Sequence, residues 1–157
     1  MDNYVTINYF IKVKKGDKSK QIVGFTAGSF DLCHAGHVLM FKECKKVCDY
    51  LVVALQSDPT LDRPYKNKPV MSLGERKIIL AGIKYIDKVV VYNTEADLVN
   101  LIKKTKPDVR IMGADWKGKE YTGRELVKLL GHKIYFNSRN HSYTTSELRK
   151  RIYEAER

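Results

Sequence analysis

The stretch that decides the fold is residues 22–37, which read IVGFTAGSFDLCHAGH. Its first four residues form a short apolar run that predicts a β-strand. Small residues at Ala27, Gly28 and Ser29 then allow the backbone to approach a ligand closely. The HAGH sequence at residues 34–37 falls where an amphipathic helix is expected to begin, and the free N–H groups of a helix start bind anions. Two imidazoles at that position can donate hydrogen bonds to phosphate oxygens and stabilise charge that develops during a reaction.

Four more apolar runs follow, at residues 49–55, 88–92, 109–112 and 133–136. They are apolar on both faces, which is typical of strands in a buried parallel sheet rather than in a half-exposed antiparallel one. Between them lie helical patterns with recognisable starts. Ser72, Thr122 and Thr144 each have glutamate three residues later, which is the spacing of a capping box, and Thr94 is a further candidate cap.

This strand–helix alternation predicts an α/β fold, a Rossmann-like, doubly wound, parallel five-stranded sheet in a single domain. In such folds, ligands bind beyond the carboxyl ends of the strands, where the strand order switches. Residues 1–20 stand outside the alternation and are expected to form an N-terminal extension, either an edge strand or a flexible arm. The domain proper is expected to cover residues 21–157.

Composition narrows the class of protein. The chain has 157 residues, 43% of them hydrophobic and 30% charged, which fits one folded domain. No apolar run approaches the roughly 20 residues of a membrane span, and the N-terminus does not resemble a signal peptide. We therefore expect a soluble, cytoplasmic protein without membrane insertion. The three cysteines are an odd number, and Cys44 and Cys48 are more consistent with buried thiols than with an incomplete metal site.

The net charge of +11 is compatible with a nucleic-acid binder or with a site for phosphorylated small molecules. The basic residues are spread along the whole chain, and no basic helix interleaved with aromatic residues is present. No zinc-finger or RNA-binding signature is present either. A basic surface with local phosphate affinity is the favoured interpretation, and no nucleic-acid partner is expected.

Three motifs of the sequence resemble those of a known family. The HAGH sequence within GSFDLC matches the HxGH signature of the nucleotidylyltransferase superfamily, and the match is closest to the cytidylyltransferases, particularly the small bacterial glycerol-3-phosphate cytidylyltransferases. Residues 111–119, IMGADWKGK, resemble the family's MGxDWxGK loop. Residues 142–149, SYTTSELR, resemble the end of its RTxGxSTT segment. The resemblance covers roughly residues 22–155, and the three motifs agree in order and spacing.

The resemblance implies transfer of CMP from CTP to a small phosphorylated alcohol, with glycerol 3-phosphate as the expected acceptor and CDP-glycerol and pyrophosphate as products. It implies in-line attack without a covalent enzyme intermediate, Mg²⁺ bound with CTP, and a homodimer. The catalytic residues implied are His34, His37 and Lys66. Arg63 and Lys68 are alternatives to Lys66 and candidate acceptor ligands, although a solvated basic loop explains each of these three residues equally well.

The resemblance also implies a nucleotide site, and we assign no residue as a direct metal ligand. The candidate residues of the nucleotide site are Gly28, Ser29, Phe30, Gly36, Gly113, Asp115, Arg139, Tyr143, Thr144, Thr145 and Ser146. Thr144 has a second interpretation as a helix cap, which is compatible with the first. Trp116 either covers the end of the sheet or contacts the base, and Asp31 is either structural or helps to position a metal.

Two departures from the family pattern bear on the choice of base. Ser138 occupies the position of the family's arginine, with Arg139 one residue away, and Ala114 stands where many relatives carry an acid. The alternatives are an adenylyltransferase, a cytidylyltransferase with another phosphorylated acceptor, and a nucleotide-binding protein without catalytic activity.

Overall fold

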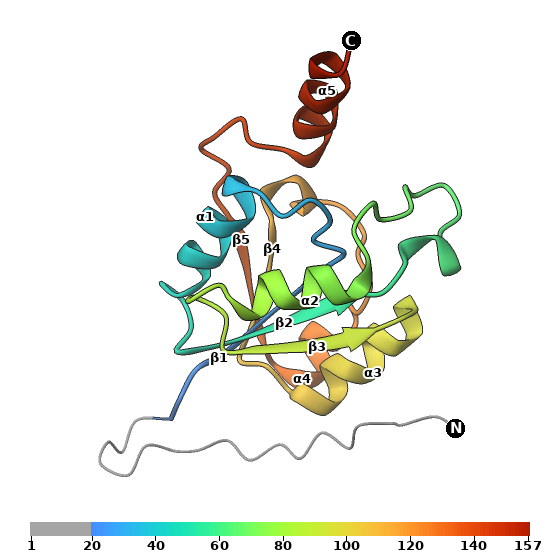
Figure 1. Ribbon diagram of the computed structural model, residues 1–157. Helices are drawn as coiled ribbons and strands as arrows, with labels where there is room; N and C mark the ends of the chain where they lie inside the picture. The colour runs from blue at the N-terminus through green and yellow to red at the C-terminus, as the bar shows by residue number, and fades with distance from the viewer. Residues whose placement is uncertain (1–19) are drawn as a thin grey trace.

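A five-stranded sheet with the order β3-β2-β1-β4-β5 forms the centre of the computed structural model, which describes residues 20–157 (Figure 1). All neighbouring strands are parallel. The strands are β1 (Val23–Gly28), β2 (Tyr50–Gln56), β3 (Lys88–Tyr92), β4 (Val109–Gly113) and β5 (Lys133–Asn137). The predicted Rossmann-like fold is therefore confirmed, while the predicted extension lies outside the described residues except for Lys20, whose Nζ is 2.7 Å from Asp108.

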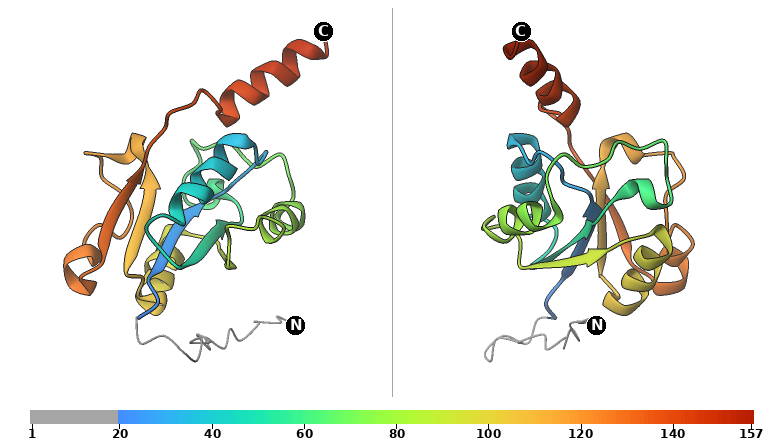
Figure 2. Two further views of the ribbon diagram at one scale, coloured as in Figure 1. Left: turned by 90° about the vertical axis from the view of Figure 1, so that its left-hand side faces the viewer. Right: turned by 45° about the vertical axis from the view of Figure 1, so that its right-hand side comes forward.

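Helices cover both faces of this sheet (Figures 1 and 2). On one face, α1 (Ala35–Cys44) and α2 (Leu73–Ala81) contribute Phe41, Cys44 and Leu80 to a buried cluster. On the other face, α3 (Glu95–Thr105) and α4 (Leu126–Leu130) contribute Leu98, Ile102 and Leu126. The strands are buried by both layers, which explains why their sequences are apolar at nearly every position.

Short 3-10 helices follow two of the strands, η1 (Pro59–Leu61) after β2 and η2 (Ala114–Trp116) after β4. The last helix, α5 (Thr145–Ala155), extends away from the sheet and contains no buried residue (Figures 1 and 2). Among residues 20–157, no helix combines the length and the apolar character that crossing a membrane requires.

The cysteines of α1 and the turn after it are structural. Cys44 and Cys48 are both buried, and burial raises the pKa of their thiols to about 12 and about 11. Such thiols stay protonated at neutral pH and are poor metal ligands.

Most of the predicted helix starts are confirmed. The hydroxyls of Ser72, Thr94 and Thr144 each accept a hydrogen bond from the backbone N–H three residues later. The prediction for Thr122 is wrong: α4 begins only after Glu125, without a side-chain cap, and the Thr122 hydroxyl donates to Glu95 instead. The Thr122 hydroxyl therefore bonds a carboxylate that is distant in sequence instead of the backbone of the next helix. The spacing of residues in the sequence does not reveal such a partner.

The strand order places a crevice between β1 and β4. From β1 the chain proceeds outward through β2 to β3, and it then returns to the other side of β1 with β4. β1 also runs three residues beyond its predicted end at Phe25, because its last residues pair with β2. On the β4 side, however, β1 is paired only at Gly24 and Phe25. The carboxyl ends of β1 and β4 are therefore not held together, which is where doubly wound folds bind ligands.

Candidate active site

Two adjoining cavities occupy this crevice, a main cavity of about 850 Å³ and a side cavity of about 290 Å³. We call the two together the cleft. The residues that line both are Ala27, Gly28, Ser29, Phe30, His37, Met112, Trp116 and Thr145. The end of β1, the start of α1, the end of β4 and the start of α5 thus meet in one place.

The two histidines of the HAGH sequence form the start of α1. His34 is the N-cap residue, and its Nδ1 accepts a hydrogen bond of 3.0 Å from the Gly36 backbone N–H. The Nδ1 of His37 accepts one of 3.2 Å from the His34 backbone N–H. The ring centroids lie 4.1 Å apart. Because Nδ1 is an acceptor in both rings, the proton of each neutral imidazole sits on Nε2, which makes that nitrogen a donor.

The charge state of the pair follows from its surroundings. Burial lowers the pKa of His37 to about 4, with a further lowering by the neighbouring His34 and Arg139. Burial, followed by His141 and Arg139, also lowers the pKa of His34. At neutral pH both imidazoles are therefore uncharged Nε2–H donors. The Nε2 of His34 lies 3.3 Å from the Thr145 hydroxyl at the start of α5.

Gly36 allows the two helix starts to touch. A Cβ at this position would lie 2.9 Å from both His34 Cε1 and the Tyr143 carbonyl oxygen, and 3.0 Å from His141 Cε1. Any side chain would thus displace either the His34 ring or the segment that leads into α5. The glycine of the HAGH sequence is required by this close approach.

Asp31 fastens the loop between β1 and α1 to two other segments. Its carboxylate is 7% exposed and accepts hydrogen bonds from the Val70 and Met71 N–H groups, both of 2.9 Å. Arg149 of α5 donates a third, of 2.8 Å. Of its two predicted roles the structure supports the structural one, since these donors engage both oxygens.

Arg76, which the sequence analysis did not identify, holds the same loop in place through hydrogen bonds. Its guanidinium is almost fully buried and donates to the carbonyl oxygens of Ser29, Gln56 and Ser57. The loop itself contains two non-glycine residues with left-handed backbone, Phe30 (φ 46°) and Leu32 (φ 48°). Such conformations cost free energy and are retained where surrounding contacts enforce them. An arginine within the first turn of a predicted helix was the only sequence signal.

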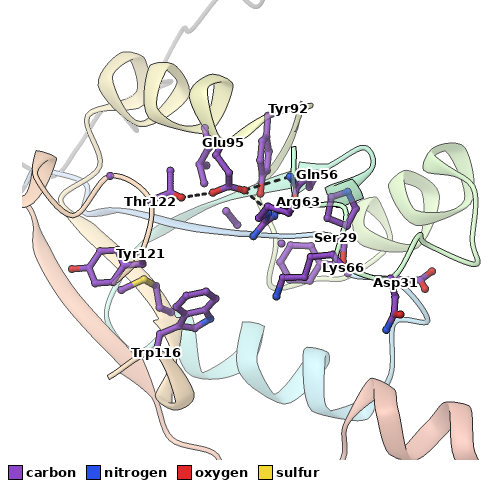
Figure 3. A pocket seen from close by; sticks show the side chains of 18 of the residues that line it. Ser29, Asp31, Gln56, Arg63, Lys66, Tyr92, Glu95, Trp116, Tyr121 and Thr122 are labelled. Carbon is purple, nitrogen blue, oxygen red and sulfur yellow. Dashed lines mark hydrogen bonds and ion pairs between the residues drawn. The ribbon is translucent and has the colours of Figure 1, made fainter. Parts of the chain in front are cut away.

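A second network that sequence reasoning missed lies in the main cavity (Figure 3). Glu95, at the start of α3, pairs with Arg63 at 2.8 Å and accepts hydrogen bonds from Gln56 and Thr122. Gln56 Oε1 in turn accepts a hydrogen bond of 2.6 Å from Arg63. The Arg63 charge is thus balanced within the protein, whereas Lys66, the other cation of that loop that lines the main cavity, has only the Tyr65 ring beside it, at 5.6 Å. Trp116 and Tyr121 lie on the other side of the drawn cavity (Figure 3).

The structure brings most of the candidate residues to the cleft. Those lining the main cavity are Gly28, Ser29, Phe30, His37, Arg63, Lys66, Thr145 and Ser146, and those lining the side cavity include His34, Gly36, Gly113, Asp115, Arg139 and Tyr143. Thr144 and Lys68 line neither: Thr144 caps α5, and Lys68 is exposed. Arg139 lies 3.6 Å from Asp115, and Trp116 is 37% exposed beside them.

Comparisons with known proteins agree with this geometry. The family described as cytidylyltransferase-like matches residues 25–151. The chain is 43% identical over 112 residues to the bifunctional protein HldE of Campylobacter concisus, covering 71% of this chain and 24% of that protein. It is 37% identical over 134 residues to HldE of Helicobacter pylori, covering 85% and 28%. The chain therefore spans about a quarter of the length of these relatives.

Solved structures show the same fold. A lipopolysaccharide core biosynthesis protein from Thermoplasma volcanium matches with a TM-score of 0.65 and 26% identity, over 78% of this chain and 100% of that one. The pantoate-β-alanine ligase of Francisella tularensis shares the fold alone, with a TM-score of 0.53 and 21% identity, over 85% of this chain and 70% of that one.

Proposed function

Because the chain belongs to the cytidylyltransferase-like family of nucleotidyltransferases, we propose that it transfers CMP from CTP to a small phosphorylated alcohol, with glycerol 3-phosphate as the first acceptor to test. The observation that carries this proposal is the pair of neutral imidazoles, whose Nε2–H donors lie at a helix start in the cleft, that of His34 beside the Thr145 hydroxyl. Donors fixed in place before the reaction stabilise the charge of a phosphoryl-type transition state without reorganisation.

In the proposed reaction an acceptor phosphate oxygen forms a bond to the α-phosphorus of the triphosphate. The bond between the α-phosphorus and its bridging oxygen to the β-phosphate breaks, and pyrophosphate leaves. His34 and His37 donate to the oxygens on which negative charge gathers, while Lys66 neutralises phosphate charge from the main cavity. Thr145 and Ser146, at the start of α5, offer hydroxyls and helix N–H groups to the leaving phosphates.

Magnesium is proposed to arrive with the triphosphate. Within residues 20–157, no three histidine, cysteine, aspartate or glutamate side chains gather as a metal site. Asp31, the nearest acid to the histidines in sequence, is engaged by Val70, Met71 and Arg149. The residues present therefore do not form a magnesium cage, and none of the steps above depends on one. Magnesium bound mainly by substrate phosphates is a usual arrangement.

Transfer of AMP from ATP is the second candidate. Two features of the side cavity depart from the cytidylyltransferase pattern and leave the choice of base open. Ala114 stands where many cytidylyltransferases carry an acid, and Arg139 is directed to Asp115 rather than left free. The relatives reported above are also HldE proteins rather than glycerol-3-phosphate cytidylyltransferases.

The test is pyrophosphate release by the purified full chain with CTP or ATP and a panel of phosphorylated alcohols and sugar phosphates. His34→Ala, which removes one of the two imidazoles, is the control. Turnover with CTP, abolished in the control, supports the first proposal, and turnover with ATP alone replaces it with the second. Binding of either nucleotide without pyrophosphate release under any combination would contradict both and leave a nucleotide-binding protein.

A further inference from the structure

The main cavity contains a buried arginine that the proposed mechanism does not use. Arg110 is the one charged residue of β4, is 5% exposed and lines this cavity. Its Nη1 is fully enclosed and has no hydrogen-bond partner, and Arg110 forms no ion pair with any residue from 20 to 157. The nearby carboxylate of Glu95 is already bound to Arg63 and Thr122. A permanent positive charge is therefore buried without an ion pair among the described residues.

The loop before α4 is shaped around this guanidinium. Gly123 has a left-handed backbone (φ 79°), and a Cβ at that position would lie 2.9 Å from Arg110 Nη1. The guanidinium carbon also lies 5.1 Å from the centre of the Tyr121 ring, a cation–π distance. This contact compensates only part of the cost of burying an ion, since burial lowers the pKa of Arg110 despite the surrounding tyrosines and glutamates.

The arginine lies well away from the histidines along the sheet. Arg110 is in register with Phe25, three residues before Gly28 at the end of β1. At about 3.3 Å per residue this places the Arg110 Cα roughly 10 Å before the level of the β1 strand end. Ser29, His37, Lys66 and Arg110 all line the main cavity, and the backbone of Arg110 lies deeper along the sheet than that of Ser29.

We propose that Arg110 determines acceptor specificity by binding a second anionic group of the acceptor, a carboxylate or a phosphate, remote from the phosphate that attacks. The inference rests on the proposed function in taking the main cavity as the acceptor site. An anionic group placed there would balance the charge that the protein leaves unbalanced. It follows that glycerol 3-phosphate fills only the reacting end of the cavity, and that the preferred acceptor is phosphorylated at one end and acidic at the other.

The test compares matched probes that differ only in that second group. Glycerol 3-phosphate is paired with 3-phosphoglycerate, and sorbitol 6-phosphate with 6-phosphogluconate; each pair exchanges a hydroxymethyl group for a carboxylate. Trp116 is the only tryptophan of the chain and lines the cavity, so its fluorescence reports binding without any turnover. Each titration is run with and without α,β-methylene-CTP.

The wild-type protein is expected to bind the acidic member of at least one pair about 10- to 100-fold more tightly, the usual size of a charge-assisted hydrogen bond. Arg110→Met should abolish this preference and change the affinity for the neutral members less than twofold. Arg110→Lys, a point charge without the planar fork, should keep only part of it. If Arg110→Met does not fold, the Lys variant decides.

Stability separates this role from a structural one. Removing a buried charge that has no ion pair should leave the thermal midpoint of Arg110→Met unchanged or raise it, whereas a purely structural arginine would lower it. No acid preference in either pair, or the same preference in the wild type and both variants, overturns the inference. Because binding is read without catalysis, failure of nucleotidyl transfer and failure of this inference are distinguishable.

Discussion

Two helix starts face the same cleft, and they are built differently. The start of α1 carries His34 and His37 on a helix that buries Gly36, Phe41 and Cys44. The start of α5 carries Thr144 and Thr145 on a helix that buries no residue. The start of α5 contacts the region of Gly36 and His34. In addition, the ion pair between Arg149 and Asp31 attaches α5 to the loop before α1.

The difference indicates that the two helix starts have different roles. The α1 start is held by the hydrophobic core, so its donors are fixed before substrate arrives. The α5 start is held by polar contacts of modest strength, so it is free to respond to a bound triphosphate. We therefore expect substitutions in α1 to act on stability and turnover, and substitutions in α5 to act on nucleotide affinity.

The largest expected contrast is in stability. Phe41 in α1 is 0% exposed, and Ile152 in α5 is 45% exposed. Phe41→Ala should lower the free energy of unfolding by about 3 to 5 kcal/mol through lost burial and a cavity. Ile152→Ala should change it by less than about 0.5 kcal/mol. Urea unfolding followed by circular dichroism measures both, and equal losses would show that α5 is packed in solution.

The second contrast concerns turnover. Removing one fixed donor to transition-state charge typically costs about 100- to 1,000-fold in rate. His37→Ala should lower kcat by at least that factor, and His34→Ala similarly. The double variant should lose less than the product of the two, because both rings act on one charge.

Matched variants of His37 distinguish the role of its Nδ1 from that of its Nε2. Asn places an acceptor where Nδ1 receives the His34 N–H, and it lacks a donor at Nε2. Gln supplies a donor near Nε2 and loses the cap. If donation is what matters, His37→Gln retains more activity than His37→Asn, while His37→Asn is the more stable. Near-normal kcat in His37→Asn would exclude a catalytic donor at this position.

The same histidine predicts how stability depends on pH. Its pKa is about 4 in the folded state, against an ordinary value of about 6.5 when unfolded. Between these values only the unfolded chain takes up the proton, so stability is complete above pH 6.5 and falls as the pH decreases toward 4. The loss should reach up to about 3 kcal/mol. The free energy of unfolding, measured with urea from pH 4.5 to 7.5, should depend less steeply on pH in His37→Gln than in the wild type. An unchanged pH dependence would show that another group causes it.

How much of this architecture the sequence predicts depends on the range of the contacts. The five strands and the caps at Ser72, Thr94 and Thr144 are local patterns, and all were found. The histidine cap at the start of α1 was expected as a helix start, although its reciprocal bonds were not. The family follows from three ordered motifs and is confirmed, whereas the nucleotide and the acceptor remain proposals.

The residues that sequence reasoning missed act across the fold. Glu95 meets Arg63 from 32 positions away, and Thr122 leaves its expected cap for the same carboxylate. Spacing along one helix carries no information about such partners. Arg110 did carry a signal, as a charged residue within an apolar strand, but only the structure shows that its charge is unpaired.

The smallest expected effect tests the α5 side of the comparison. The Thr144 hydroxyl accepts a hydrogen bond of 3.0 Å from the Glu147 N–H and caps α5. Thr144→Ala should cost about 1 kcal/mol of helix stability. Because α5 is nearly independent of the core, this cost should appear as fraying of its first turn rather than in global unfolding. The turn holds Thr145 and Ser146 at the cleft, so the KM for the nucleotide should rise while kcat changes little. Thr144→Ser, which keeps the hydroxyl, serves as the control. A KM equal to that of the wild type, together with faster amide exchange in α5, would leave Thr144 a helix cap and remove the α5 start from the nucleotide site.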